Sequence, residues 1–254
     1  MCIWRSGGVL LLSVCAMLGV TANLRTPARA DDSGGRPAHF EVWTGAQAYT
    51  DVWSSYTGFT LAPFGPIDQD GWRVRLAGGY GADRYTNSSG TRFEGATTFA
   101  DGLIGYHSGL GPLTVKVFAG VAMVDRQIEP GDPDARILGT DFGGKVALET
   151  WLNLGDRAWT AIDMSWASLY RDYAGRARLG WRLTPELSSG IEAGAVGNFD
   201  SDIIRAAAFL RYEGARGEVS VTAGVSNDTL LSGNRRLDVS SAAPFAMLNW
   251  LQRF

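Results

Sequence analysis

The sequence is short of the residues that most often build a chemical site, and it has no long apolar segment. Its two cysteines, Cys2 and Cys15, lie in the first 30 residues. We expect these residues to be removed, which leaves no disulfide, no cysteine-ligated metal and no cysteine nucleophile. The longest apolar run, residues 9–20, is shorter than the about 20 residues that a membrane-spanning helix needs. A remaining chain that enters a membrane would therefore cross it with strands.

The first 30 residues have the layout of a secretory signal peptide. Arg5 precedes the apolar run, and Ala28-Arg29-Ala30 offers small residues for cleavage after Ala30. Cys15 would suit a lipoprotein signal, but the preceding residue fits such a site poorly. We therefore predict a cleaved signal at residues 1–30, a short periplasmic segment at residues 31–38 and one domain at residues 39–254.

The charge of the remaining chain argues against nucleic-acid binding. Removing the three arginines of the signal from 23 basic residues leaves 20, against 26 acidic residues, for a net charge of −6. Lys116 and Lys145 are the only lysines, and the other basic residues are arginines. Arginine keeps its charge in a partly dehydrated interior and pairs with carboxylates through two hydrogen bonds.

Hydrophobic alternation predicts β-strands with one apolar and one polar face. In residues 71–81, Trp72, Val74, Leu76 and Tyr80 alternate with arginine, alanine and glycine, which is the period of two of a strand. The same pattern returns at residues 115–121, 162–166 and 178–183. A soluble sandwich is the alternative. Polar faces rich in Arg, Asp, Glu, Gly and Ser favour a membrane barrel, which turns its apolar face to lipid.

The pattern predicts an all-β, antiparallel transmembrane β-barrel of about 12 strands. We place them at residues 39–50, 53–63, 71–85, 92–107, 113–127, 138–152, 158–170, 174–184, 187–198, 203–214, 217–227 and 244–254. An even number places both termini at one end, and we expect that end to be periplasmic, with the longest connections outside the cell. Residues 63–70 break this asymmetry. A ten-stranded barrel remains the alternative if the first two strands are misdrawn.

Aromatic residues near the predicted strand ends suggest the two girdles of an outer-membrane barrel. The alternative is a tryptophan-rich sandwich core. The final residue, Phe254, together with Trp250, is expected to be the signal that the outer-membrane assembly machinery recognises. The residues assigned to the girdles are Trp43, Trp53, Tyr56, Trp72, Tyr80, Tyr85, Trp151, Trp159, Trp166, Tyr170, Trp181, Tyr212 and Trp250.

Three segments resemble the cellulose biosynthesis protein BcsS family of alphaproteobacteria. They are residues 56–60 (YTGFT), residues 69–81, which run from QDGWRVRL into GGYG, and residues 111–121 (GPLTVKVFAGV). The Asp-Gly-Trp-Arg stretch at residues 70–73 is the most specific part. The resemblance extends from about residue 40 to the end of the chain. In the second half of that stretch it rests on the rhythm of the strands rather than on a motif. The resemblance implies an outer-membrane accessory of a cellulose synthase and secretion system, and it supplies no catalytic residues.

The charged residues in phase with the polar faces are predicted to point into the lumen. Buried charges must be paired or hydrated. We therefore interpret them as a network that fills and stiffens a small barrel, and the alternative is a water-filled passage for a neutral glucan. The predicted inward residues are Arg73, Arg75, Arg176, Arg178, Arg182, Arg205, Arg211, Glu41, Asp141, Lys145, Glu149, Asp163, Glu192 and Glu213.

An outer-membrane hydrolase is the competing function. Only His39 and His107 could act as a base near neutral pH, and no serine stands in a Gly-x-Ser-x-Gly elbow. Asp132 and Asp134 could hold calcium, but their segment lacks the spacing and closing glutamate of an EF-hand loop. We expect no cofactor and no metal.

The sequence thus predicts a non-catalytic accessory of cellulose production or export in the outer membrane of a Gram-negative bacterium. A general narrow channel is the second reading, and a hydrolase that uses His107 or His39 is the third. The expected partners are outer-membrane lipid, the assembly machinery, cellulose synthase or secretion subunits and glucan chains, without nucleic acid.

Overall fold

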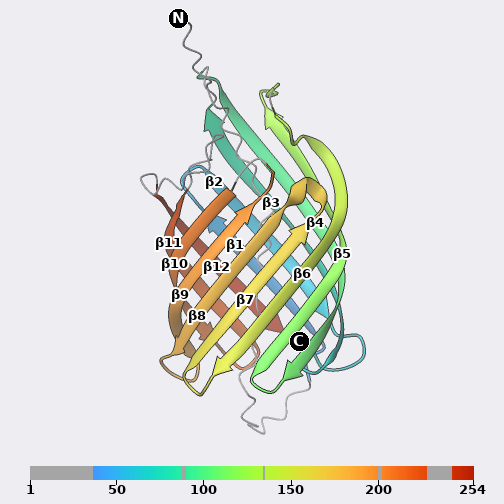
Figure 1. Cartoon of the computed structure of the whole chain (residues 1–254), viewed down its shortest axis with the longest axis vertical. Coiled ribbons are helices and arrows are strands. Elements are labelled where there is room, and N and C mark those ends of the chain that lie inside the picture. The colour runs from blue at the N-terminus through green and yellow to red at the C-terminus, as the bar shows by residue number, and fades with distance from the viewer. Residues whose placement is uncertain (1–36, 87–89, 134, 200–201, 228–241) are drawn as a thin grey trace, which may run out of the picture.

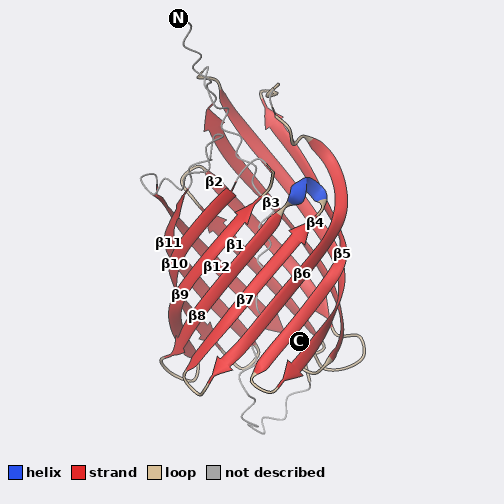
Figure 2. Cartoon of the chain, in the orientation of Figure 1, coloured by secondary structure: helices blue, strands red, loops and turns tan. Residues whose placement is uncertain are grey.

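The chain forms a closed barrel of twelve antiparallel strands in sequence order, with β12 hydrogen-bonded to β1 (Figure 1, Figure 2). The computed structural model describes residues 37–86, 90–133, 135–199, 202–227 and 242–254. The predicted twelve-stranded barrel is confirmed, and the ten-stranded alternative is wrong. The expected signal at residues 1–30 and most of the connection at 228–243 lie outside the described residues. The strands are β1 (Phe40–Ala48), β2 (Val52–Leu61), β3 (Gly71–Thr86), β4 (Arg92–Leu110), β5 (Leu113–Glu129), β6 (Gly139–Leu154), β7 (Ala158–Ala167), β8 (Tyr173–Arg182), β9 (Leu187–Gly197), β10 (Asp202–Glu213), β11 (Gly217–Asn227) and β12 (Ala242–Arg253).

Strand β3 shows how the sequence produces the two faces of the barrel wall. Arg73 and Arg75 are 2% and 4% exposed, whereas Trp72 and Leu76 are 54% and 56% exposed. Successive side chains of a strand point to opposite faces, so the arginines lie inside and the apolar residues outside. An outward apolar band is what the acyl chains of a membrane cover in barrels of this type.

Four consecutive strands are longer than the other eight. Strands β3 to β6 have 16, 19, 17 and 16 residues, and the others have 9 to 12. β6 begins at Gly139 but pairs with β7 only from Lys145 onward. The extensions, residues 84–86, 92–94, 125–129 and 139–144, rise above the rest of the barrel at the end away from the C-terminus (Figure 1). We call them the four-strand wall, and that end the wall end.

The connection between β2 and β3 is a long turn, as one of the two sequence-based readings predicts. It covers residues 62–70, and the neighbouring strands are drawn correctly. The Ile67 amide donates to the Ala38 carbonyl at 2.7 Å. The Arg73 guanidinium donates to the Ile67 carbonyl at 3.0 Å. An arginine inside the barrel thus holds the turn folded against the barrel end.

The ends of the described chain meet where the barrel closes. The Phe254 amide donates to the Phe40 carbonyl at 2.9 Å, and the His39 amide donates to the Phe254 carbonyl at 2.7 Å. The two phenylalanine rings stack with centroids 5.0 Å apart. The last residues therefore continue the β1–β12 pairing beyond Arg253.

A short 3₁₀ helix, η1 (Leu169–Arg171), connects β7 to β8. The predicted strand at residues 158–170 therefore ends early, at Ala167. Tyr170 and Arg171 have φ values of 49° and 54°, in the left-handed region that a strand cannot include. The Ser168 amide donates to the Gly144 carbonyl at 2.8 Å, which docks this connection on β6. Among the described residues, no helix is both long and apolar enough to cross a membrane.

The aromatic residues divide between the two faces, so the predicted girdle is only partly correct. Trp53, Trp72, Tyr80, Trp166, Trp181, Tyr212 and Trp250 are exposed on the outer face. Tyr170 lies in η1. The assignment of five residues to the girdle is wrong, because they are buried inside the barrel: Trp43, Tyr56, Tyr85, Trp151 and Trp159. Each of them lies an even number of positions along the chain from the other inward-facing residues of its strand, so it lies on the inner face.

Candidate functional site

The interior of the barrel holds the largest concentration of charged side chains in the described chain. Nine basic and eight acidic side chains are buried there or at the rim. The near balance of charge leaves no strong field for anions or for cations. The basic members are Arg73, Arg75, Lys116, Arg126, Lys145, Arg176, Arg178, Arg205 and Arg211, and the acidic members are Glu41, Asp83, Asp101, Asp132, Glu149, Asp163, Glu192 and Glu218.

Glu149 on β6 is the centre of the first cluster. Arg75 on β3 forms an ion pair with it across the lumen, and Lys116 Nζ on β5 lies 3.7 Å from its Oε2. The Arg75 guanidinium also stacks over the Phe118 ring, with 3.8 Å between the guanidinium carbon and the ring centroid. A carboxylate flanked by two cations compensates charges that would be costly to bury alone.

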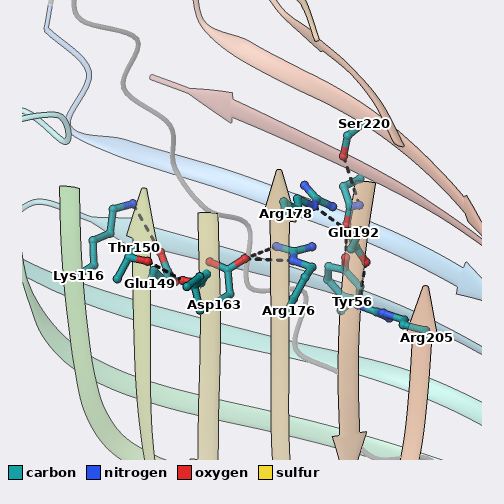
Figure 3. Close-up of polar contacts among 12 residues, drawn as sticks. Tyr56, Lys116, Glu149, Thr150, Asp163, Arg176, Arg178, Glu192, Arg205 and Ser220 are labelled. Atoms are coloured by element: carbon teal, nitrogen blue, oxygen red, sulfur yellow. Dashed lines mark hydrogen bonds and ion pairs between the residues drawn. The ribbon is translucent and has the colours of Figure 1, made fainter. Parts of the chain in front are cut away.

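A second cluster runs across β7, β8, β9 and β10 (Figure 3). Arg176 donates from two nitrogens to Asp163 Oδ2, at 3.0 and 2.7 Å. Glu192 accepts from Arg178 at 2.7 Å and lies 3.3 Å from Arg205. The strands bring acids and bases together at similar heights, so that a continuous band of paired charge follows the inner wall.

A third cluster lies near the end where the chain termini meet. Arg211 on β10 donates to Glu218 Oε2 at 2.7 Å and pairs with Glu213 at 2.9 Å. Its guanidinium lies 5.6 and 5.7 Å from the ring centroids of Trp151 and Trp159. These two indoles stack on each other with centroids 4.0 Å apart. Cation–π contact and stacking therefore fill this level of the lumen.

Two further pairs lie toward the wall end. Lys145 Nζ is 2.8 Å from Asp101 Oδ2. Arg126 donates to both carboxylate oxygens of Asp83 at 3.0 Å and to the Thr97 hydroxyl at 2.8 Å. The bidentate geometry is the strong form of this contact, and it ties β3 to β5 at the base of the four-strand wall.

Interior aromatic rings lie opposite glycines on the neighbouring strands. Trp43 pairs in register with Gly58 and Trp159 with Gly180. A β-carbon on either glycine would overlap the indole. The ring lies over the neighbouring backbone because no side chain stands there. The same arrangement joins Tyr56 to Gly45, Phe99 to Gly79, Phe118 to Gly105 and Phe209 to Gly190.

The interior is filled by its own side chains. Arginines, carboxylates and rings at successive heights are buried, among them Trp43, Arg75 and Arg211. A cavity of about 30 Å³ lies beside Asp101 and Lys145, which is room for about one or two water molecules. The described residues therefore form a packed core rather than the wall of a wide pore.

Most of the predicted inward residues lie inside the barrel, and three lie at its ends, outside the packed interior. Asp141 is exposed at the start of β6, where it accepts from the Phe142 amide, and Glu213 is only partly buried at the end of β10. Arg182 lies at the end of β8, where it donates to Asn153 at 2.6 Å and to the Asp156 carbonyl at 3.2 Å. These residues stand where strands meet turns, beyond the packed interior. The predicted residues buried inside are Glu41, Arg73, Arg75, Lys145, Glu149, Asp163, Arg176, Arg178, Glu192, Arg205 and Arg211.

Sequence reasoning missed several members of the network, although strand parity could have found some. Lys116 stands between the outward Val115 and Val117, and Trp151 is two residues from Glu149 on the same face. Alternation alone places both inside. The pairing of Arg126 with Asp83, 43 residues apart, has no such local signal.

The geometry at His107 does not provide a base ready for catalysis. The Arg73 guanidinium lies 2.9 Å from His107 Nδ1. Arginine can only donate, so Nδ1 is occupied as an acceptor and the proton of the neutral ring is on Nε2. Asp132 accepts from the Tyr85 hydroxyl at 2.7 Å, while Asp134 lies outside the described residues. No group of three potential metal ligands from His, Cys, Asp and Glu occurs in the described part of the chain.

Comparison with known proteins agrees with the fold and gives a family. The family model described as cellulose biosynthesis protein BcsS matches residues 41–246. No curated protein sequence matches the chain. The outer membrane channel from Pseudomonas putida F1 is similar in structure, with a TM-score of 0.52 and 13% identity over 91% of this chain and 100% of the channel.

Two further solved barrels are more distant. The translocator domain of autotransporter NalP from Neisseria meningitidis has a TM-score of 0.49 and 10% identity, over 88% of this chain and 90% of the domain. The TodX monoaromatic hydrocarbon channel deltaS2 mutant has a TM-score of 0.49 and 8% identity, over 87% of this chain and 91% of the channel. The match to the P. putida channel shows the fold alone, which is that of an outer-membrane β-barrel.

Proposed function

The chain belongs to the cellulose biosynthesis protein BcsS family, and from this premise we propose that it is a non-catalytic outer-membrane accessory of cellulose synthesis and export. In this proposal the chain termini and the turn at residues 62–70 face the periplasm, and the four-strand wall faces outward. The partners are cellulose synthase or secretion subunits and the glucan they produce. Membrane lipid covers the outer apolar face, and the outer-membrane assembly machinery inserts the barrel.

The filled interior of the barrel is the observation that best supports the proposed accessory role. Glu149 is held between Arg75 and Lys116, and Arg211 lies against two stacked indoles. A sugar chain passing through this barrel would have to displace these paired charges and rings. The interior thus favours a rigid scaffold, and function is left to the surfaces that the barrel presents on either side of the membrane.

The non-catalytic part of the proposal rests on the histidines. His107 is buried, and its Nδ1 accepts from Arg73. His39 lies at the closure of the barrel, where its backbone bonds Phe254 and Ala62. A hydrolase would need one of these rings beside a nucleophilic hydroxyl, and the bonds described at His107 and His39 are to an arginine and to backbone groups.

The test is deletion of the gene, with cellulose outside the cell and synthase activity in isolated membranes measured together. We expect extracellular cellulose to fall severalfold while the membrane-bound synthase stays active. Complementation with His107→Ala is expected to restore cellulose output, with insertion checked by heat-modifiability on a gel. Normal cellulose in the deletion strain would refute the accessory role. A folded His107→Ala barrel that restores nothing would instead indicate chemistry at this residue.

A further inference from the structure

The outer face of the barrel carries a depression at the base of the four-strand wall, partly lined by it. Its volume is about 350 Å³, within the range of small-molecule sites, which hold about 300–1,000 Å³. Ala82 on β3 and Ala96 on β4 are paired in register and form the floor. Trp53 on β2 pairs with Ala82, and Gln127 on β5 pairs with Ala96. Two small residues between two large ones leave the outer surface hollow.

One edge of this outer depression is aromatic. Trp53 and Tyr80 have ring centroids 5.6 Å apart and planes inclined by 50°. The two residues are 49% and 41% exposed, so both rings keep surface that a ligand can contact. An open indole face beside a phenol offers an apolar surface together with a hydroxyl that can donate or accept a hydrogen bond.

The opposite edge is polar and places the depression at the water boundary of the membrane. Arg84 and Glu94 form an ion pair of 3.3 Å whose side chains are 59% and 63% exposed. Basic residues facing lipid at the midplane of a membrane cost about 2–4 kcal/mol, so this pair belongs above the hydrocarbon. The aromatic edge below it then lies at the level of the headgroups.

The charge of the lining excludes an anionic ligand. Arg84 is the only base that lines the outer side, and it is already paired, whereas Asp51, Glu94 and Glu129 contribute three acids. The resulting negative field repels the phosphates of a lipid headgroup. It does not repel an uncharged sugar, whose hydroxyls can donate to carboxylates and to the Gln127 amide oxygen.

We propose that the outer depression binds a short stretch of an uncharged glucan chain. One sugar face stacks on Trp53, and the hydroxyls bond the polar edge formed by Glu94, Gln127 and Glu129. The choice of glucan rests on the proposed role in cellulose production, and the site itself rests on the ring pair, the hollow and the charge. The barrel would hold emerging polymer on its outer flank and leave its interior closed.

The test uses purified full-length barrel in detergent micelles, titrated with cellohexaose in a calorimeter. We expect saturable binding that changes little with salt, because no ion pair forms with the ligand. Trp53→Ala and the floor-filling variant Ala96→Leu are each expected to weaken binding at least tenfold. Trp181→Ala, which removes an exposed tryptophan from the other end of the outer face, is the matched control and should bind as the wild type does.

The outcomes separate this inference from the accessory role. Absence of cellohexaose binding by the folded wild type, or binding unchanged in both Trp53→Ala and Ala96→Leu, would overturn the glucan site. The glucan site would also be overturned if lipopolysaccharide bound the barrel at least as tightly as cellohexaose and inorganic phosphate competed with that binding. If glucan binding fails but deletion of the gene still lowers cellulose, only the site is wrong. Heat-modifiability of each variant shows that the barrel has folded.

Discussion

At the scale of single residues, the molecule depends on carboxylates that have no access to bulk water. Glu149 is the clearest case, because two cations from other strands converge on it and neither carboxylate nor cation is more than a few percent exposed. A buried ion pair adds little stability compared with apolar residues of the same shape. Removing one partner leaves a charge without compensation, which is far more costly.

Glu149→Ala is expected to lower the free energy of unfolding by about 3–5 kcal/mol, because Arg75 and Lys116 then lose their shared carboxylate. The measurement is urea unfolding of the barrel in micelles, followed by the gel shift between folded and unfolded forms. Glu94→Ala is the matched control. Its ion pair with Arg84 is largely exposed, and its loss should cost less than about 1 kcal/mol. Equal losses in both variants would contradict the role assigned to burial.

At the scale of elements, neighbouring strands fit because rings on one strand lie over glycines on the next. Gly180 on β8 is in register with Trp159 on β7, and that indole occupies the place of the missing side chain. Aromatic residues that cover glycines across a strand pair help to fix register and curvature in sheets. A slip of one residue would turn the ring to the lipid face.

The prediction at this scale compares two glycines of β8. Gly180→Ala is expected to destabilise the barrel by about 1–3 kcal/mol, since the new β-carbon overlaps the Trp159 ring and the core must shift. Gly175→Ala places its β-carbon 3.9 Å from the nearest atom, the Ala195 carbonyl oxygen, and should change stability by less than about 0.5 kcal/mol. The unfolding midpoints of the two variants in urea give the comparison. A tolerant Gly180→Ala would show that the ring has room to move.

At the scale of the whole molecule, both the wall and the interior of the barrel are closed. Its wall is closed because β12 pairs with β1 along eight residue pairs, which leaves no strand edge inside the membrane. Its interior is closed because balanced charges and aromatic rings fill the lumen from the Arg211 level to the Arg126 level. A barrel built this way resists deformation and offers no wide passage.

The whole-molecule prediction concerns conductance. Wild-type barrel inserted in a planar bilayer is expected to show no stable current steps, because ions would have to displace buried ion pairs such as that between Arg176 and Asp163. Insertion of the same protein preparation is verified in lipid vesicles by resistance to protease and by the gel shift. Regular, voltage-independent steps from verified wild-type protein would contradict a filled interior and would support the general-channel reading of the sequence.

Much of the fold is readable from local pattern. The alternation of Arg73 and Arg75 with Trp72 and Leu76 predicts a strand with one polar and one apolar face, and repetition of this pattern accounts for the twelve strands. A long turn, one of the two readings of residues 63–70, is confirmed at residues 62–70. The predicted strand at residues 158–170 is too long, because nothing in the local pattern shows the left-handed backbone of Tyr170 and Arg171.

The sequence by itself determined the fold class, the family and which charged residues of a strand face inward. Each of these depends on residues that lie close together in the chain. Tertiary structure alone decided which charges meet, as in the pair of Arg75 with Glu149, 74 residues away. It also decided that Trp43, Trp151 and Trp159 fill the interior. An indole suits a membrane interface as well as a packed core, and its face is settled only when the strand register places a glycine opposite it.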